Sequence, residues 1–313
     1  MYKYGIVSTA SIVKRFIEGV RLAGDEVICI GSRDIDKAKE FAKNNKIKNY
    51  YGSYKEVYEN KDVDIVYIPV INSMHYECAK EALLHNKHVV LEKPFTLYPW
   101  EAVDLFEIAK KKKLFLFEGV KNLFVPSTQF IKNNINKIGV VKKISTEQGV
   151  KNPFPENHWM YDASKGGGAF HGSSSYVFHY LKYIFEYPIA KLKGSYKPSA
   201  NADMSCHFKF KLNKISVDSK INCGKELSSN CIIKGSKGKM IIHEFWRSHH
   251  VEIILKDGNL FEFKDSGNEF EYEAKHIQEC LKRKLLESPI IKKEDIIEEA
   301  ENIYYLYKKW DMV

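Results

Sequence analysis

The chain has 313 residues, 44% of them hydrophobic and 28% charged, which is the composition of a folded protein with one large or two ordinary domains. The formal net charge is +9, but lysines are spread along the whole chain and no basic patch is interleaved with aromatic residues, so we expect no nucleic-acid partner. We see no signal peptide and no apolar run long enough to cross a bilayer, and therefore expect a cytoplasmic protein with no membrane association.

The six cysteines are scattered and form no Cys-x-x-Cys pair. This distribution is typical of reduced thiols in a cytosolic protein and argues against a zinc site. No cluster of acidic residues and histidines shows ligand spacing, so the sequence predicts no metal.

Short apolar runs alternate with amphipathic helical stretches over the first 120 residues, which predicts a parallel α/β sheet. The run 65–70 is apolar at nearly every position, as expected of a parallel strand buried on both faces. In chain order, the pattern predicts strands at 4–7, 27–31, 65–70, 88–91 and 114–117, and helices at 11–23, 35–44, 76–85 and 100–111.

The pattern changes after about residue 120. Residues 191–264 consist mostly of alternating runs separated by glycine turns, which predicts a mainly antiparallel sheet. The second part therefore reads as an α+β domain, and we expect two domains, residues 1–120 and 121–313. Strands are predicted at 207–212, 216–221, 230–234 and 239–243, and helices at 126–136, 175–184, 270–286 and 293–310.

The first strand, turn and helix, at residues 4–23, occupy the place where a Rossmann domain holds a pyrophosphate against a helix N-terminus. The usual Gly-x-Gly-x-x-Gly is not satisfied, because the turn has small side chains and hydroxyls in place of the glycines. Such a turn is also an ordinary helix N-cap, so both interpretations stay open here. The dinucleotide interpretation assigns to the cofactor Ser8, Thr9, Ala10 and Ile12.

The end of the second predicted strand reads Gly31-Ser32-Arg33-Asp34. A Rossmann site that binds NAD normally has a carboxylate at the first polar position, where it binds the ribose 2′-hydroxyl. Here that position is Ser32, and Arg33 is able to pair with a 2′-phosphate and stack on adenine. The sequence therefore favours NADP, with NAD as the alternative if Asp34 turns toward the ribose.

The segment Glu92-Lys93-Pro94 follows another predicted strand, at the carboxyl edge of the sheet where ligands bind in such folds. Pro94 disfavours helical geometry at Lys93, so the chain stays extended there. Lys93 is thereby directed toward the crevice at the edge of the sheet.

Taken together, several short motifs resemble the Gfo/Idh/MocA oxidoreductase family, which includes glucose–fructose oxidoreductase, inositol dehydrogenase and dihydrodiol dehydrogenase. The opening Gly5-Ile6-x-Ser8-Thr9-Ala10 is similar to the dihydrodiol dehydrogenase-like branch, in which NADP use is common. The resemblance covers nearly the whole chain. The matching motifs are Tyr67-Ile68-Pro69, Asn72-Ser73-x-His75, His88-Val89-x-x-Glu92-Lys93-Pro94, Ser32-Arg33-Asp34-x-x-Lys37-Ala38 and Gly166-Gly167-Gly168-Ala169.

This resemblance implies an α/β fold: an N-terminal Rossmann domain with a doubly wound parallel sheet, and a C-terminal α+β domain with a large open, mainly antiparallel sheet. That sheet often serves as a dimer interface, so the expected assembly is a homodimer or homotetramer. The implied reaction moves a hydride between nicotinamide and an alcohol carbon of a sugar, polyol or diol, with Lys93 as the catalytic acid/base. The implied cofactor contacts add Pro69, Asn72, His75, Glu92 and Lys93 to the residues of the first two strand ends. Trp159, before the triple glycine, is either a further cofactor contact or a loop anchor.

The sequence departs from the family pattern after the triple glycine. The family often has an aspartate where this chain has Gly172, and a histidine or tyrosine where it has Tyr176. We expect Tyr176 to be the second catalytic group, with His171 as the alternative acid/base. His179 lies one helical turn after Tyr176 and is either a cleft residue or an ordinary helix histidine.

The missing aspartate at Gly172 also motivates a different class of function. A catalytically silent sensor or regulatory protein would bind NAD(P) without turning over a substrate. A third and weaker alternative is nonspecific nucleic-acid binding through the basic surface.

Overall fold

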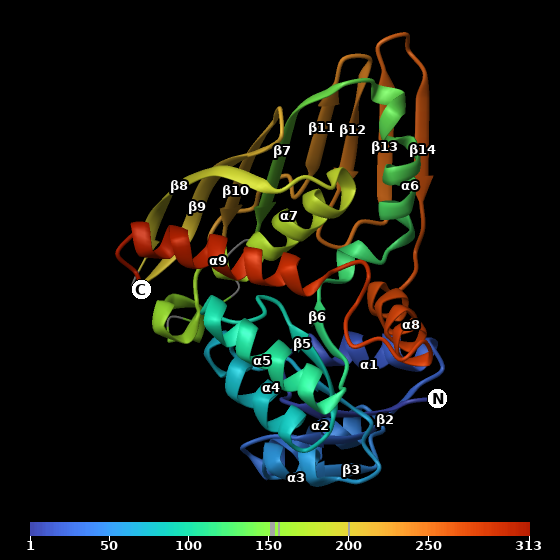
Figure 1. The fold of residues 1–313 in the computed structure, drawn as a ribbon, viewed down its shortest axis with the longest axis vertical. Coiled ribbons are helices and arrows are strands. Elements are labelled where there is room, and N and C mark those ends of the chain that lie inside the picture. The colour runs from blue at the N-terminus through green and yellow to red at the C-terminus, as the bar shows by residue number, and fades with distance from the viewer. Residues whose placement is uncertain (151–153, 156, 200) are drawn as a thin grey trace. The chain divides into compact units, whose positions relative to one another are not determined.

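The computed structural model describes residues 1–150, 154–155, 157–199 and 201–313. These residues form two compact units (Figure 1). Unit 1 consists of Met1–Gly119 and Asn268–Ala300, and unit 2 of Val120–Gly267 and Glu301–Val313.

Unit 1 is built on a six-stranded, wholly parallel sheet with the order β3-β2-β1-β4-β5-β6, which confirms the predicted doubly wound fold. The strand order reverses between β1 and β4, and ligands bind at such a reversal, beyond the carboxyl ends of the strands. The strands are β1 (Lys3–Val7), β2 (Glu26–Gly31), β3 (Asn49–Tyr51), β4 (Ile65–Ile68), β5 (His88–Glu92) and β6 (Leu116–Gly119).

Five helices connect these strands, as the alternating pattern predicts, except that the sequence did not indicate β3 and the helix that follows it. Both are short, and β3 has no buried residue, so the apolar signal on which the prediction relies is weak there. The helices are α1 (Val13–Leu22), α2 (Ile35–Asn44), α3 (Tyr54–Glu59), α4 (His75–Leu84) and α5 (Pro99–Lys112), with a 3₁₀ turn at Asn72–Met74.

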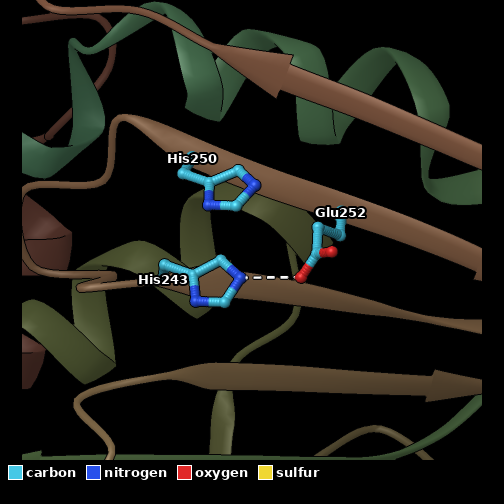
Figure 2. A group of neighbouring side chains, drawn as sticks. All are labelled: His243, His250 and Glu252. Carbon is cyan, nitrogen blue, oxygen red and sulfur yellow. Dashed lines mark hydrogen bonds and ion pairs between the residues drawn. The ribbon is translucent and has the colours of Figure 1, made fainter.

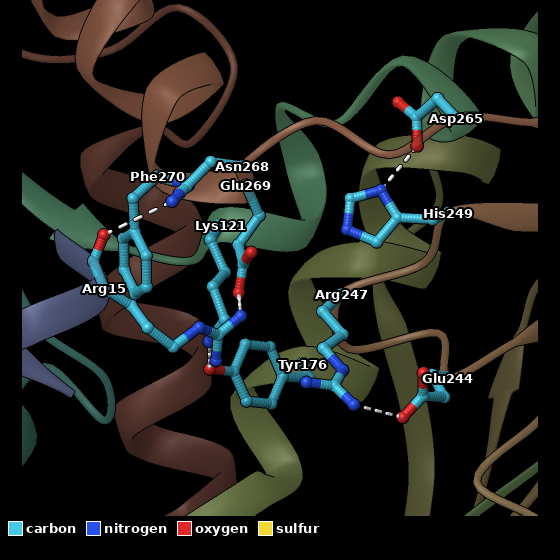
Figure 3. A network of polar contacts seen from close by, with 10 residues as sticks. All are labelled: Arg15, Lys121, Tyr176, Glu244, Arg247, His249, Asp265, Asn268, Glu269 and Phe270. Carbon is cyan, nitrogen blue, oxygen red and sulfur yellow. Dashed lines mark hydrogen bonds and ion pairs between the residues drawn. The ribbon is translucent and has the colours of Figure 1, made fainter. Parts of the chain in front are cut away.

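A helix from late in the chain, α8 (Glu269–Lys282), completes unit 1 by packing on α1. The two helices approach closely at Gly19, where an added Cβ would lie 2.5 Å from Cβ of Phe270. Arg15 forms an ion pair with Glu269, and its guanidinium lies 5.8 Å from the Phe270 ring centroid (Figure 3). The predicted division into residues 1–120 and 121–313 therefore differs from the two compact units, because residues 268–300 belong to the same unit as the N-terminal sheet.

Unit 2 contains an eight-stranded sheet with the order β14-β13-β12-β11-β7-β10-β9-β8. Every neighbouring pair is antiparallel except β7 and β10, which confirms the predicted mainly antiparallel sheet (Figure 1). The strands are β7 (Val141–Gly149), β8 (Ile189–Ser199), β9 (Ala202–Leu212), β10 (Ile215–Asn222), β11 (Cys231–Gly235), β12 (Gly238–His243), β13 (His250–Leu255) and β14 (Leu260–Lys264).

One face of this sheet is covered by α7 (Ala169–Phe185), which packs against β9 and β10. Along the strands, core residues alternate with residues that stay partly exposed on the other face. The remaining helical segments of unit 2 are α6 (Pro126–Asn134) and short 3₁₀ turns at Lys121–Leu123, Ile135–Ile138, Trp159–Tyr161 and Ala163–Lys165. The last helix, α9 (Lys293–Lys309), begins in unit 1 and ends in unit 2.

α7 begins six residues before the predicted start at residue 175, directly after the triple glycine. A carboxylate from β9 makes this early start possible, because Oδ2 of Asp203 accepts the backbone N–H of Phe170 at 2.8 Å. A buried acceptor at a helix N-terminus satisfies a donor that has no partner inside the helix. No helix in the described part of the chain is long and apolar enough to cross a membrane.

Candidate functional site

The turn after β1 holds the first group of predicted cofactor residues. Ser8 has φ of 126°, a conformation that favours glycine, and it occupies the place of the first glycine of the fingerprint. Its backbone N–H donates to the carbonyl of Gly31 at 2.9 Å, and its Oγ accepts the N–H of Ala10 at 3.1 Å. Thr9, Ala10 and Ile12 are all partly exposed just before α1 begins at Val13. The turn thus leads small side chains past the N-terminal end of a helix.

The end of β2 separates the roles of three consecutive residues. Asp34 is the N-cap of α2: its Oδ1 accepts the N–H groups of Asp36 at 3.1 Å and Lys37 at 3.2 Å. Ser32 is buried, and its Oγ accepts the N–H of Asp34. Arg33 is exposed. Burial raises the pKa of Tyr54, and the nearby charge of Arg33 opposes this rise. Turning Asp34 toward a ribose would cost the helix its cap, whereas Arg33 has no capping role.

The loop after β4 is tied to the segment that carries Lys93. Pro69 directly follows β4, and Asn72 is buried in the 3₁₀ turn that comes next. His75 is fully buried; its Nδ1 lies 2.8 Å from the carbonyl of Pro94, and its Nε2 lies 3.2 Å from the carbonyl of Val70. Burial lowers the pKa of His75, so the ring is neutral at pH 7. His75, predicted as a cofactor contact, thus links the two loops through backbone contacts.

At the end of β5, Glu92 is buried and its Oε1 accepts the hydroxyl of Tyr67 at 2.7 Å. Tyr67 is fully buried in β4 and stacks on Phe16 of α1 with 3.5 Å between ring centroids. Lys93 follows directly and is partly exposed. The carboxylate of Glu92 is therefore anchored by the core of unit 1, while the next side chain reaches the edge of the sheet.

These four segments lie at the carboxyl ends of β1, β2, β4 and β5 of one parallel sheet, on either side of the reversal in strand order. Such an edge, together with a helix N-terminus and small residues in the first turn, is suited to an extended dinucleotide. The residues at this edge of unit 1 thus fit a nicotinamide dinucleotide.

Unit 2 contains a polar group of its own, centred on Tyr176 in α7. Its hydroxyl accepts a hydrogen bond from Nζ of Lys121, and both side chains are buried (Figure 3). The ammonium lies 4.6 Å from the Tyr176 ring centroid and 5.5 Å from that of Trp246. A positive charge held against a phenol oxygen stabilises that oxygen when it gives up a proton. Lys121 was not among the predicted site residues, because the segment around it departs from the family pattern.

His171, the alternative to Tyr176, lies in a different environment. It is buried in the first turn of α7, stacks on Tyr307 with 4.1 Å between ring centroids, and places Nδ1 3.3 Å from the carbonyl of Gly167. The Tyr307 hydroxyl donates to Oδ1 of Asp203 at 2.6 Å. Burial raises the pKa of Asp203 to about 7. The sequence analysis did not identify this aspartate, because it lies far along the chain from the triple glycine although the two are close in space.

The other predicted positions of unit 2 are also placed by the structure. Gly172 lies inside α7, where only Met160 Cε comes within 4 Å of an added Cβ, at 3.4 Å. His179 is buried on the same helix, one turn after Tyr176. Trp159 is partly exposed and lies 5.6 Å from the His158 ring, which stacks on Phe154. Residues 151–153 and 156, which precede Trp159 in the sequence, lie outside the described residues.

Comparison with known proteins gives consistent matches. Residues 2–120 match the model of the Gfo/Idh/MocA oxidoreductase family, NAD-binding Rossmann fold. The trans-1,2-dihydrobenzene-1,2-diol dehydrogenase of Xenopus tropicalis is 27% identical over 310 residues and 92% of each chain. An uncharacterised oxidoreductase of Synechocystis is 34% identical over 165 residues, which are 51% of this chain and 44% of that one.

Two solved structures share the fold over nearly the whole chain. A 3-ketoreductase from Actinomadura kijaniata, in complex with NADP and TDP-benzene, superposes with a TM-score of 0.86 at 22% identity, over 98% of this chain and 97% of that one. An aldose-aldose oxidoreductase from Caulobacter crescentus superposes with a TM-score of 0.85 at 18% identity, over 99% and 98%.

Proposed function

We propose that this chain, which matches the model of the Gfo/Idh/MocA oxidoreductase family over residues 2–120, transfers a hydride between NADP and an alcohol or carbonyl carbon of a sugar, polyol or diol. The proteins that support this substrate class are a trans-1,2-dihydrobenzene-1,2-diol dehydrogenase, a 3-ketoreductase and an aldose-aldose oxidoreductase. We also propose that residues 1–120 bind the cofactor and residues 121–313 the substrate, and that the protein is a cytoplasmic homodimer or homotetramer.

The observation that carries this proposal is the placement of Lys93. It directly follows a buried glutamate that Tyr67 anchors, at the edge of the sheet where the first turn and Arg33 also lie. A lysine in this position donates a hydrogen bond to the oxygen of the reacting carbon. In the oxidative direction, Lys93 accepts the hydroxyl proton as the carbon loses its hydride; in the reductive direction it returns that proton.

The bound nicotinamide supplies the hydride acceptor or donor, and the protein supplies position and proton transfer. Glu92 fixes the backbone beside Lys93 through its bond to Tyr67, and His75 fixes the next residue through the carbonyl of Pro94. The cofactor contacts we propose are those of the four strand ends, Ser8, Thr9, Ala10, Ile12, Ser32, Arg33, Pro69, Asn72, Glu92 and Lys93, with Trp159 from unit 2.

For the second proton-transferring group, we favour Tyr176 over His171. Lys121 holds a positive charge at the Tyr176 hydroxyl, so this oxygen is suited to donate and recover a proton. His171 is engaged by Tyr307 and by the carbonyl of Gly167, which suits a role in anchoring the start of α7.

The proposal is tested by nicotinamide absorbance with the purified chain. The assay uses NADP⁺ and NAD⁺ with a panel of aldoses, inositols and diols, and NADPH and NADH with the matching carbonyl compounds. Turnover of one class supports the enzyme. Tight cofactor binding without turnover in either direction, across the whole panel, would instead support the silent sensor that Gly172 suggests.

Replacing Arg33 by alanine is expected to weaken NADPH binding about 10-fold or more while leaving NADH binding nearly unchanged. A charge-assisted hydrogen bond is worth about 1.5–3 kcal/mol, and only NADPH carries the 2′-phosphate that Arg33 would bind. Fluorescence titration of both dinucleotides measures the ratio of the two dissociation constants. Lys37→Ala is the matched control, since Lys37 is an exposed cation on the first turn of the next helix. An unchanged ratio in Arg33→Ala contradicts the assignment.

A further inference from the structure

Two histidines and a glutamate meet on the sheet of unit 2, in two strands that hold none of the residues proposed above for the reaction. His243 ends β12, His250 begins β13, and the two are direct cross-strand partners. Glu252 lies two residues further along β13 and therefore on the same face. Ile242, just before His243, and Val251, between His250 and Glu252, are fully buried on the opposite face. The trio thus lies on the partly exposed side of the sheet.

The side chains of this trio converge (Figure 2). One ligand atom from each of the three residues lies within 4.8 Å of the other two. Nε2 of His243 donates to Oε2 of Glu252 at 2.8 Å, and the two imidazoles stack with 4.3 Å between centroids and 14° between planes. Zinc with bonds of about 2.0–2.1 Å needs ligand atoms ~3.3 Å apart. Binding one ion therefore requires the three side chains to move so that their ligand atoms face one common position.

Glu262 of β14 adds a second carboxylate next to the trio. Its Oε1 accepts Nε2 of His250 at 2.9 Å and Nζ of Lys264 at 2.7 Å. Carboxylates bound to a ligating histidine orient the ring and raise its basicity. Glu252 and Glu262 thus bring two carboxylates to the two histidines, with Lys264 bound to Glu262, and carboxylates favour a cation at the trio.

A second pair on the same sheet shows what an ordinary surface contact looks like there. Nε2 of His207 donates to Oδ1 of Asp218 at 2.8 Å, and Asp218 also pairs with Lys209. Asp218 therefore has one histidine and one lysine as partners, whereas Glu252 lies beside two histidines, His243 and His250. Two stacked imidazoles repel each other when both are protonated, whereas a metal ion binds both rings in their neutral form.

We propose that His243, His250 and Glu252 form a binding site for a divalent transition-metal cation such as Zn²⁺. Two imidazoles and one carboxylate are a ligand set of this class of ion, while Ca²⁺ and Mg²⁺ prefer oxygen ligands throughout. The three side chains are 26–34% exposed, so an ion reaches them from solvent. Binding ties β12 to β13 and does not depend on the proposed hydride chemistry.

The test uses the full chain without a histidine tag, stripped with a chelator and titrated with Zn²⁺ by calorimetry and with Co²⁺ by visible absorption. We expect one equivalent per chain, a thermal midpoint that rises with Zn²⁺, and about 100-fold or greater loss of affinity in His243→Gln and in His250→Gln. His207→Gln is the matched control and should bind as the wild type does.

Because all three variants change exposed residues of one sheet face, thermal unfolding in chelator shows whether each one is folded. Wild-type affinity in both His243→Gln and His250→Gln, or the absence of saturable binding by the wild type, would overturn the proposal. Equal weakening in His207→Gln would also overturn it, because binding would then be shared among surface histidines.

Discussion

Replacement of Lys93 by methionine is expected to lower kcat/KM about a thousandfold, within the range usual for removing a general acid/base, with a much smaller loss of affinity for NADPH, since Lys93 is one of many proposed cofactor contacts. Methionine keeps the length of the side chain but cannot exchange a proton. The backbone around it is held by His75 and Glu92 through contacts that do not involve the Lys93 side chain, so the fold should be unaffected. Steady-state kinetics with the substrate found in the panel, together with NADPH titration, separates the two effects.

Lys93→Arg distinguishes proton transfer from simple charge. Arginine keeps the positive charge but does not lose its proton in proteins, so we expect it to be nearly as slow as Lys93→Met. Recovery of wild-type turnover by arginine would show that only the charge matters. Turnover of Lys93→Met close to that of the wild type would remove Lys93 from the chemistry.

Gly168→Ala is expected to destabilise unit 2 by about 3–5 kcal/mol, the range in which backbone strain and a core clash add together. Gly168 has φ of 108°, and an added Cβ would lie 2.0 Å from Oδ1 of Asp203 and 2.9 Å from the Tyr307 hydroxyl. The substitution strains the backbone and forces apart the buried group that starts α7. Urea unfolding followed by near-ultraviolet circular dichroism measures the loss.

Gly172→Ala is the control for this experiment, four residues along the same chain segment. Its added Cβ meets only Met160 Cε, at 3.4 Å, and alanine is favoured over glycine inside a helix by ~1 kcal/mol. We expect unchanged or increased stability. Equal stability of Gly168→Ala and the wild type would show that the triple glycine does not serve to bring Asp203 against α7.

The sequence predicted the sheet of unit 1 well, because parallel strands buried on both faces leave continuous apolar runs such as 65–70. It also predicted the Gfo/Idh/MocA resemblance, which the family model and the relatives confirm. It did not predict that α8 packs on α1, since an amphipathic helix shows which of its faces is buried but not against which partner. Within the predicted antiparallel region, β13 and β14 were not predicted individually; in β14, the exposed apolar residues Leu260 and Phe261 break the expected alternation.

The candidate site was predictable only in part. Short motifs indicate residues at strand ends, and the structure places those of unit 1 at one edge of the sheet. Local sequence does not show that Asp34 is engaged as a helix cap, or that Asp203 reaches across to α7. The His243 and His250 pair was also hidden, because its proximity depends on the register of two strands joined by a loop.

We expect the turn after β1 to hold the pyrophosphate of a nicotinamide dinucleotide. Titration of the wild type and of Ala10→Glu with NADPH tests this directly and needs no known substrate. A glutamate at Ala10 places a negative charge and extra volume at the start of α1, where we expect the phosphates. Our account predicts one NADPH per wild-type chain and a loss of affinity of at least about 10-fold in Ala10→Glu, as expected from like-charge repulsion of more than ~1.4 kcal/mol. Equal affinity in the two proteins, or no binding of NADPH or NADH by the wild type, would contradict it.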